Sequence, residues 1–433
     1  MQPSTASHTL EQWLDYQQRV HARGIELGLD RVREVWDRMG APRIARRVIT
    51  IGGTNGKGST VAFLEAMLRD AGLRVGAYTS PHIARYNERV RIDGVEAGDD
   101  GLIAAFERIE AARDADSKKT VPLTYFEFGT LAAFELFARA GLDVALLEVG
   151  LGGRLDAVNI VDADAAIVTT VDLDHMEWLG NDRMSIGREK AGIFRKDRPA
   201  IVGEADPPAS LLDEARRIGA CVMRAGVDYR FAATGDHWTW RSNEASLSLP
   251  LPTLAAPSQI ANAAAAIAAL HALREPFGWN PEAIARGVRE ARLPGRMQAI
   301  ATSPQVVVDV AHNPQAAREL ARWVDIHRIP GATFAVFGAL MDKDVAGIAR
   351  ALHPRIAHWH LAGLEGDSPR GLPVAELAHR IRDVIPGASS SEHADVAAAL
   401  HAARAGAAAR DRILVFGSFF VVSAVLPRDA APG

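Results

Sequence analysis

The chain has 433 residues, of which 48% are hydrophobic and 24% charged, so it can bury sizeable cores and intrinsic disorder is excluded as its main state. At about 150 residues per domain, this length predicts more than one domain. The net charge of −4 offers no electrostatic attraction for nucleic acid or an anionic membrane surface, and we expect neither as a partner.

Cysteine content and hydropathy indicate the cellular compartment in which the protein is expected. Cys221 is the single cysteine, which excludes an intramolecular disulfide and indicates a reducing environment. The N-terminus lacks the charged-then-apolar order of a signal peptide, and the most apolar stretch, 413–426, is interrupted and too short to span a bilayer. We therefore expect a cytoplasmic protein.

In the first part of the chain, short β-branched runs alternate with longer amphipathic stretches, which is typical of βαβ units and a mostly parallel sheet. Between the first two runs, Val61, Leu64 and Leu68 recur at helical spacing and Gly72 follows as a C-cap, which predicts a helix over 59–71. Buried strands are expected at 48–51, 75–79, 144–149, 166–171 and 200–202.

The pattern changes after the last of these strands. Short segments with Trp238 and Trp240 over 223–248 predict a small antiparallel hairpin, and an alanine-rich helix is expected over 258–273. Turn chemistry at 293–296 places a domain boundary at about residue 295. We expect an N-terminal α/β domain over 1–295 and a smaller C-terminal α/β domain over 296–433, with strands at 306–310, 333–337, 356–361 and 413–416 and a helix in the tract 397–409.

The most informative motif joins the first strand to its helix and reads Val48-Ile-Thr-Ile-Gly-Gly-Thr-Asn-Gly-Lys-Gly-Ser-Thr60. Glycines let backbone N–H groups approach phosphate oxygens, the helix N-terminus adds favourable electrostatics, and Lys57 can reach the β- and γ-phosphates. The run departs from the usual P-loop, because Ile51 stands where the first glycine belongs and Gly58 follows the lysine. An ordinary glycine-rich turn is the alternative, and a dinucleotide fingerprint is disfavoured. The strand–turn–helix setting favours a phosphate site.

Polar residues also follow other expected strands, at the sheet edge where ligands bind in open α/β folds. Glu148 is placed where a carboxylate can hold Mg²⁺, with a capping role as the weaker alternative. His175 ends an Asp-Leu-Asp-His run, and the residues alone favour a structural histidine, because imidazole is an unusual Mg²⁺ ligand. Ser80 precedes a proline and suggests a turn, and the spacing around Lys190 predicts an exposed helical lysine beside Glu189.

The run Gly53-Thr-Asn-Gly-Lys-Gly-Ser59 resembles the phosphate loop of the Mur ligase superfamily, which makes amide bonds through acyl phosphates. Within it, the chain is similar, from its N-terminal helix to Phe420, to the family of bacterial bifunctional dihydrofolate synthases/folylpolyglutamate synthases. The resemblance implies an N-terminal P-loop ATPase domain that also binds pterin, and a C-terminal Rossmann-like domain that completes the ATP and glutamate sites. It implies an ATP-dependent ligase of folate biosynthesis and one-carbon metabolism, which adds L-glutamate to dihydropteroate, forming dihydrofolate, and to reduced folates, forming polyglutamates.

The resemblance also implies roles for single residues. Lys57, His175 and Lys190 would be catalytic, two Mg²⁺ ions would be held by Ser80, Glu148 and His175, and Lys190 would be carbamylated to an anionic oxygen ligand. ATP would contact Thr54, Asn55, Gly56, Lys57, Gly58, Ser59, Asn262, Arg296, Asp309 and His312. The pterin would contact Gly24, Ile25, Leu27, Thr124, Phe126 and Asp156. Such enzymes are commonly monomeric, and we expect a monomer.

This chain departs from the family in the pterin segment: where the family has Ile-Asp-Leu-Gly-Leu, this chain has Glu26 in place of the aspartate. Purely structural roles remain open: an interdomain salt bridge for Arg296, a helix-entry cap for Asp309, core packing for Phe126 and a turn cap for Asp156. Other functions remain open too: a folylpolyglutamate synthase without dihydropteroate activity, a nucleotide-gated binding module, and a P-loop kinase. A Mur-type ligase acting on a nucleotide-linked peptide is disfavoured by the folate-like motifs.

Overall fold

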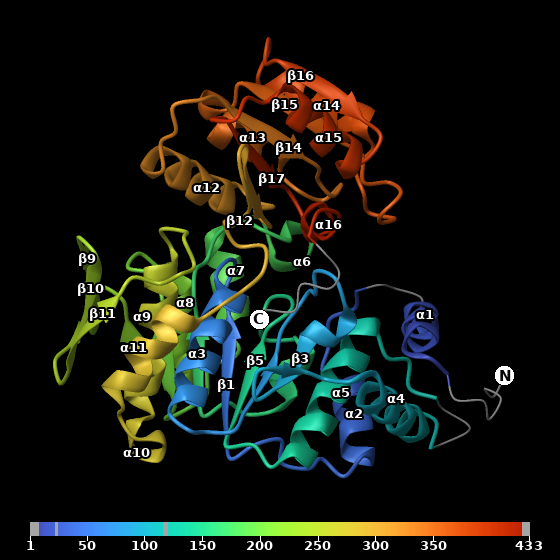
Figure 1. The fold of residues 1–433 in the computed structure, drawn as a ribbon. Coiled ribbons are helices and arrows are strands. Elements are labelled where there is room, and N and C mark those ends of the chain that lie inside the picture. Colours follow the sequence, from blue (N-terminus) through green and yellow to red (C-terminus); the bar gives the residue numbers. More distant parts are fainter. Residues whose placement is uncertain (1–7, 22–24, 116–119, 427–433) are drawn as a thin grey trace.

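The computed structural model describes residues 8–21, 25–115 and 120–426, which form a larger α/β unit and a smaller one stacked above it (Figure 1). The larger sheet has the strand order β4-β3-β2-β5-β1-β6-β7-β8. Neighbouring strands pair in parallel except at one edge, where β3 pairs antiparallel with both β2 and β4, so the expected mostly parallel sheet is confirmed. The bounds are Arg47–Gly52 (β1), Val75–Tyr78 (β2), Val90–Ile92 (β3), Val95–Glu96 (β4), Val144–Glu148 (β5), Ala165–Val168 (β6), Pro199–Val202 (β7) and Cys221–Arg224 (β8).

Helices cover both faces of this sheet, because its central strands are apolar on both sides. Ile49 and Ile51 of β1 belong to the core under α3 and α9, whereas Val48 belongs to the core formed with α2, α4 and α5. The helices are Leu10–Val20 (α1), Asp30–Arg38 (α2), Lys57–Asp70 (α3), Asp99–Arg113 (α4), Tyr125–Ala140 (α5), Met176–Leu179 (α6), Arg183–Ala191 (α7), Ala209–Ile218 (α8), Gln259–Ala272 (α9), Arg274–Phe277 (α10) and Pro281–Glu290 (α11), with short 3₁₀ turns at Tyr86–Arg89 and Ala157–Ile160.

The smaller unit is a second three-layer arrangement. Its sheet has the order β12-β13-β17-β14-β15-β16 and is parallel apart from β12. The core on one face is formed with α12, α13 and α14, and that on the other with α15 and α16. The bounds are Gln298–Thr302 (β12), Gln305–Asp309 (β13), Pro314–Ile326 (α12), Thr333–Phe337 (β14), Val345–Leu352 (α13), His358–Ala362 (β15), Val374–Val384 (α14), Ser390–His393 (β16), Val396–Gly406 (α15), Arg412–Phe416 (β17) and Phe419–Ser423 (α16), with a 3₁₀ turn at His353–Arg355.

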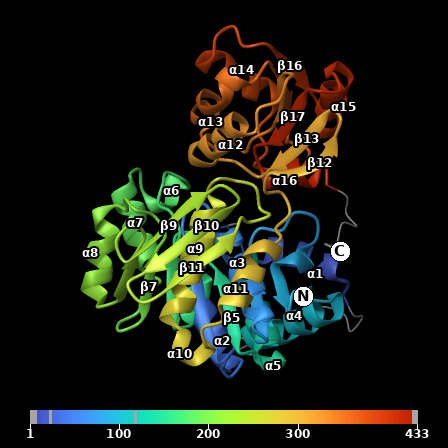
Figure 2. The same ribbon diagram turned by 60° about the vertical axis from the view of Figure 1, so that its left-hand side comes forward.

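Two expectations need correction. The segment expected as a hairpin forms three antiparallel strands, β9 (Tyr229–Thr234), β10 (His237–Ser242) and β11 (Ser246–Pro250), which lie over α9 (Figure 2), while its first residues belong to β8 of the large sheet. The strand expected at 166–171 ends at Val168, because the hydroxyls of Thr169 and Thr170 turn to the loop after β1. The other expected strands and helices are present, with shifts of at most three residues at their ends.

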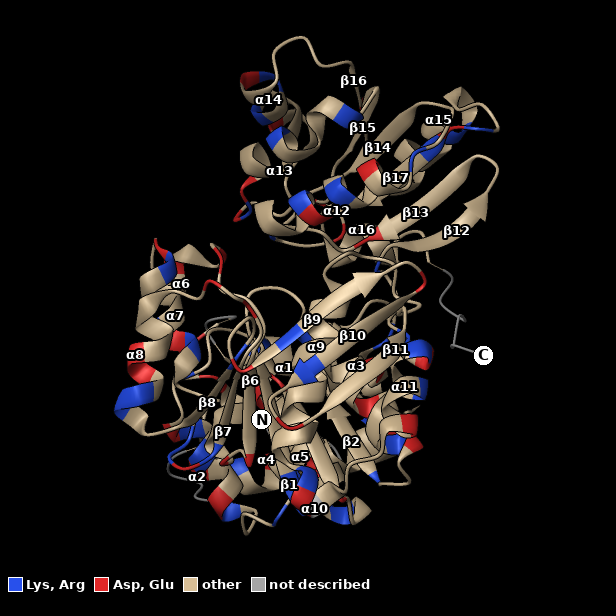
Figure 3. Cartoon of the chain, turned by 90° about the vertical axis from the view of Figure 1, so that its left-hand side faces the viewer, with Lys and Arg blue, Asp and Glu red and all other residues tan. Residues whose placement is uncertain are grey.

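Charged residues of both signs occur on α8, α12 and α14, while the central strands of the large sheet carry few of them (Figure 3). This distribution matches amphipathic helices that turn their apolar faces to the sheets. No helix in the described part of the chain has both the length and the apolar character needed to cross a membrane.

Candidate active site

The loop between β1 and α3 can be built only with glycine at two positions. Gly53 and Gly56 have φ angles of 137° and 88°. A Cβ atom on Gly53 would lie 1.9 Å from Thr169 Oγ1, and one on Gly56 would lie 2.3 Å from Asn262 Oδ1. The glycines therefore set both the left-handed backbone of the loop and its close approach to β6 and α9.

Hydroxyl groups that follow β6 hold this loop in place. Thr169 Oγ1 donates to Asn55 O at 2.6 Å, and Asn55 N donates to Thr170 Oγ1 at 3.2 Å. Asp172 N donates to Thr54 Oγ1, and Thr54 Oγ1 donates to Asp172 O, both at 3.0 Å. These bonds explain why β6 ends early.

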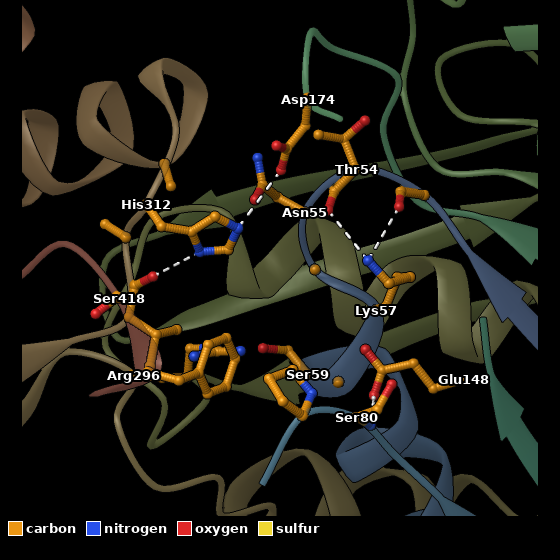
Figure 4. A pocket seen from close by; sticks show the side chains of 18 of the residues that line it. Thr54, Asn55, Lys57, Ser59, Ser80, Glu148, Asp174, Arg296, His312 and Ser418 are labelled. Atoms are coloured by element: carbon orange, nitrogen blue, oxygen red, sulfur yellow. Dashed lines mark hydrogen bonds and ion pairs between the residues drawn. The ribbon is translucent and has the colours of Figure 1, made fainter. Parts of the chain in front are cut away.

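Lys57 is the first residue of α3, and its side chain turns back over the loop (Figure 4). Its Nζ donates to Gly53 O at 3.1 Å and to Thr54 O at 3.2 Å. The ammonium group thus lies beside the backbone N–H groups at the N-terminus of α3, where positive charge and the helix dipole together favour an anion.

A cavity of about 720 Å³ opens between the two α/β units. Its volume suits a nucleotide-sized ligand. The structure brings to its walls every residue expected to bind ATP or metal, or to be catalytic: Thr54, Asn55, Gly56, Lys57, Gly58, Ser59, Ser80, Glu148, His175, Lys190, Asn262, Arg296, Asp309 and His312. Segments more than 200 residues apart in sequence therefore share one site (Figure 4).

Glu148 and Ser80 lie side by side at the ends of β5 and β2. Ser80 N donates to Glu148 Oε2 at 3.2 Å, and burial raises the pKa of Glu148 against the opposing influence of Lys57. No three His, Cys, Asp or Glu side chains converge as a metal site within the described residues. A buried carboxylate and a hydroxyl beside a phosphate loop nevertheless fit Mg²⁺, which takes few protein ligands and keeps waters and phosphate oxygens.

His175 approaches the cavity from the loop after β6. Its backbone is left-handed, with φ of 49°, and its Nε2 lies 4.0 Å from Asp174 Oδ1. Burial lowers the pKa of His175 to about 4, so the ring is neutral near pH 7. A neutral imidazole keeps a lone pair free for a cation.

Lys190 differs from the exposed helical lysine that its spacing predicted. The residue is 4% exposed and lines the cavity, whereas Glu189 pairs with Arg154 at 2.9 Å. Burial, followed by the charge of Lys57, lowers the pKa of Lys190 to about 7. Much of this amine is therefore uncharged at neutral pH.

The wall formed by the smaller unit carries Arg296 and Asp309. The Arg296 guanidinium lies 5.5 Å from the centre of the Phe419 ring, and burial lowers its pKa although Asp309 and Glu148 oppose the shift. Asp309 accepts the N–H groups of Met297 at 2.9 Å and Ala311 at 2.8 Å. Its carboxylate thus braces the turn that presents Arg296.

Three residues of the interdomain contact were missed by the sequence reasoning. Asp174 lies 2.7 Å from Lys343 Nζ and accepts from Asn313 Nδ2 at 3.2 Å. Asp174 and Asn313 stand beside His175 and His312 in the motifs already considered, but Lys343 has no local pattern that marks it. Only the packing of the two units brings these groups together.

The expected pterin residues that the structure describes lie outside the cavity lining. Thr124 and Glu127 form the capping box of α5. Asp156 accepts from Leu151 N at 2.8 Å and Val158 N at 3.1 Å, so the turn cap is present, and burial raises its pKa to about 6. Gly24 lies outside the described residues, and the other expected pterin residues, Ile25, Leu27, Thr124, Phe126 and Asp156, do not line the cavity.

Phe126 and Asp156 nevertheless support that wall. The Phe126 ring packs against Gly150, where a Cβ atom would lie 2.6 Å from Phe126 Cζ, and Asp156 holds the backbone of Leu151. Gly150 and Leu151 themselves line the cavity. The two side chains are therefore one layer from the space that ATP-site residues enclose.

Family models and known proteins match most of this chain. Residues 51–270 match the Mur ligase middle domain and residues 295–419 match the Mur ligase glutamate ligase domain. The dihydrofolate synthase/folylpolyglutamate synthase of Escherichia coli K12 is 46% identical over 422 residues, covering 97% of this chain and 96% of that protein. The structure resembles that of E. coli FolC in complex with DHPP and ADP, with a TM-score of 0.90, 45% identity and 98% of each chain covered. It also resembles a bifunctional folylpolyglutamate synthase/dihydrofolate synthase solved with Mn, AMPPNP and L-glutamate, with a TM-score of 0.88, 45% identity and the same coverage.

Proposed function

The chain belongs to the dihydrofolate synthase/folylpolyglutamate synthase family of ATP-dependent Mur-type ligases, and we propose that it joins L-glutamate to dihydropteroate and to reduced folates. The observation that carries the proposal is the interdomain cavity, in which the Lys57 loop faces Glu148 and Ser80 and is closed by Arg296 of the smaller unit. This arrangement supports a site in which a triphosphate would meet an acid and an amine.

The reaction has two steps. A carboxylate of the folate attacks the γ-phosphate of ATP, which forms an acyl phosphate and releases ADP. The neutral α-amino group of glutamate then attacks the acyl carbon, phosphate leaves, and the amine loses a proton as the amide forms. Phosphate is a good leaving group, so positioning and electrostatics supply most of the catalysis.

Several side chains would act on the transferred phosphate. Lys57 and the N–H groups of residues 56–59 would hold the β- and γ-phosphate oxygens, and Arg296 would bind them from the opposite wall. Two Mg²⁺ ions, held by Ser80, Glu148 and His175, would neutralise phosphate charge. Water would be excluded between the two units, which protects the acyl phosphate from hydrolysis.

Lys190 would serve as a carbamate. Its burial and its pKa of about 7 support this role, because only an uncharged amine reacts with carbon dioxide. The reaction converts a cation that lies near Lys57 into an anion, which removes a repulsion inside the cavity. The carbamate oxygens would be further ligands for Mg²⁺.

The pterin would bind next to the ATP cavity, on Gly24, Ile25, Leu27, Thr124, Phe126 and Asp156. The aromatic face of Phe126 suits a pterin ring, and the Asp156 carboxylate can accept from its amino and ring N–H groups. We also propose a domain boundary at residue 295 and a monomer that acts in the cytoplasm.

One experiment tests the function. The purified protein is given Mg²⁺-ATP and L-glutamate with dihydropteroate or tetrahydrofolate, and the products are identified by mass spectrometry. Dihydrofolate in the first reaction and a lengthened glutamate chain in the second support both activities. Product only from tetrahydrofolate would instead indicate the alternative, a folylpolyglutamate synthase without dihydropteroate activity, and no glutamate-dependent ADP release with either would refute the ligase proposal.

A further inference from the structure

Asp174 of the larger unit is contacted from the smaller unit at three points. Lys343 Nζ lies 2.7 Å from Oδ1, and Asn313 Nδ2 donates to Oδ2 at 3.2 Å. His312 Nε2 lies 3.5 Å from Oδ2 (Figure 4). The side chains of Lys343 and Asp174 are only 5% and 10% exposed. A carboxylate at the edge of one unit is thus enclosed by donors from the other.

The loop that carries Asp174 is also bound to the phosphate loop. Asp172 exchanges two hydrogen bonds with Thr54, and Asp174 Oδ1 accepts the backbone N–H of His175 at 2.9 Å. Residues 172–175 therefore connect three parts of the site: the phosphate loop, His175 and the smaller unit. A displacement of Asp174 would move His175 with it.

The Lys343 side chain is held so that its charge points across the boundary. Its backbone lies in the turn between β14 and α13, where Lys343 N donates to Leu340 O at 3.2 Å and Val345 N donates to Lys343 O at 2.9 Å. The neighbouring Asp342 lies 3.5 Å from Nζ but is itself paired with Arg370 at 2.6 Å. Asp174 is therefore the principal partner of the buried ammonium group.

Buried ion pairs contribute little net stability, because desolvation offsets their attraction, and in some proteins they instead select a specific geometry. A pair that serves only to join the units would not need to be buried next to catalytic residues. The contact between Arg318 and Asp172, at 2.7 Å, also joins the two units through the same loop, yet the Arg318 side chain is 53% exposed. The buried Lys343–Asp174 pair can therefore be compared with the exposed Arg318–Asp172 pair, which joins the same two units.

We propose that Lys343 is a positioning residue that acts through Asp174: when the smaller unit docks, the Lys343–Asp174 contact sets the 172–175 loop and places His175 for the reaction. The inference rests on the proposed ligase function for its catalytic consequence. Its structural part, the coupling of interdomain docking to this one contact, can be measured without turnover.

The test uses Lys343→Met, Asp174→Asn, the double variant, and Arg318→Met as the matched control, with circular dichroism and thermal melts to verify folding. Lys343→Met is expected to lower kcat/KM for ATP about 100-fold, as misplacement by about an ångström does. Arg318→Met, which removes an exposed pair, is expected to change it by no more than about threefold. Because Lys343 and Asp174 act as one unit, the double variant should be no worse than the more impaired single variant.

A second readout reports docking itself. Cys221 is a free, exposed cysteine in the larger unit, and Ala405→Cys adds an exposed partner in the smaller one, so spin labels on the pair report the interdomain distance. Lys343→Met should broaden this distance distribution, and Arg318→Met should leave it unchanged. The proposal would be overturned if Lys343→Met and Arg318→Met changed the distance distribution equally. It would also be overturned if the losses of kcat/KM in Lys343→Met and Asp174→Asn multiplied in the double variant. If even the unaltered enzyme formed no amide, the ligase function would be refuted, while the distance measurement would still decide whether Lys343 controls the docking of the two units.

Discussion

Asn55 of the phosphate loop and Asn313 of the smaller unit exchange two side-chain hydrogen bonds, of 3.1 Å from Asn55 Nδ2 to Asn313 Oδ1 and 3.0 Å in return. Asn313 Oδ1 also accepts Ala316 N at 3.0 Å and so caps α12. One amide therefore both starts a helix and joins the second unit to the loop expected to hold ATP.

The two roles of Asn313 can be separated. Asn313→Ser keeps an N-cap oxygen but is too short to reach Asn55 or Asp174, so KM for ATP should rise about tenfold with little change in melting temperature. Asn313→Ala should raise KM similarly and also lower the free energy of unfolding by about 1 kcal/mol. Steady-state kinetics and thermal melts of both variants test this. An unchanged KM in the serine variant would show that the amide pair does not support the nucleotide site.

Lys57→Ala should reduce kcat by about 10³-fold or more, because the charge that faces the transferred phosphate is lost. The fold should persist, since the side chain bonds only to loop carbonyls. Exposed Lys196, replaced by Ala, is the control and should retain full turnover. ADP release measured for both variants tests whether Lys57 acts on the transferred phosphate. Near-normal turnover of Lys57→Ala would remove this residue from the phosphate site.

Lys190 should make activity depend on carbon dioxide and pH. Because its pKa is lowered to about 7, the uncharged amine becomes the major form above that pH, so carbamate should increase from pH 6 to pH 8. Labelled bicarbonate followed by ¹³C NMR measures it directly. Lys190→Ala should be inactive and should recover partly with a short carboxylic acid, whereas a fully active variant would eliminate the carbamate.

Because Asp156 is buried, its ionisation should make the free energy of unfolding depend on pH. Its folded pKa of about 6 lies above the ordinary value of 3.8, so its contribution to stability is full below about pH 4 and is lost as pH rises through about 6. Asp156→Asn cannot ionise, so the variant should gain stability relative to the unaltered protein across that window in denaturant titrations. A difference that stayed constant with pH would contradict the buried carboxylate.

Replacement of Asp156 should impair the use of dihydropteroate more than the binding of ATP. Asp156→Ala removes the acceptor proposed for the pterin, so KM for dihydropteroate should rise by at least about tenfold while ATP binding changes little. Calorimetric titration with nucleotide supplies the comparison. A defect confined to ATP binding would assign Asp156 to the nucleotide site instead.

Glu148→Gln should weaken metal binding without unfolding the protein, because the amide oxygen can still accept the N–H of Ser80. Affinity for Mn²⁺ in the presence of nucleotide, followed by electron paramagnetic resonance, should fall by at least about tenfold. Chelation of the metal should stop turnover in the unaltered enzyme. Unchanged Mn²⁺ affinity in the variant would exclude Glu148 as a ligand.

The strands and helices nearest the site show which local sequence patterns were sufficient to predict secondary structure. Strand β1, the glycine loop and α3 were predicted within a few residues, since left-handed glycines, a buried strand and a helical repeat are properties of adjacent residues. Strand β6 was predicted too long, because Thr169 and Thr170 have high strand propensity but bind the phosphate loop instead. Packing with a distant segment overrode propensity there.

Amino-acid sequence alone therefore determined the alternation of strands and helices and the phosphate loop, because these depend on short-range spacing, whereas the other residues expected around ATP followed from the family resemblance of their motifs. The tertiary structure decided what burial and distance control: the low pKa of Lys190, the position of Asp156 behind the wall, and the contacts of Asn313 and Lys343 across the two units. Desolvation and interdomain contact arise only when segments more than 100 residues apart come together, so no local pattern could carry them.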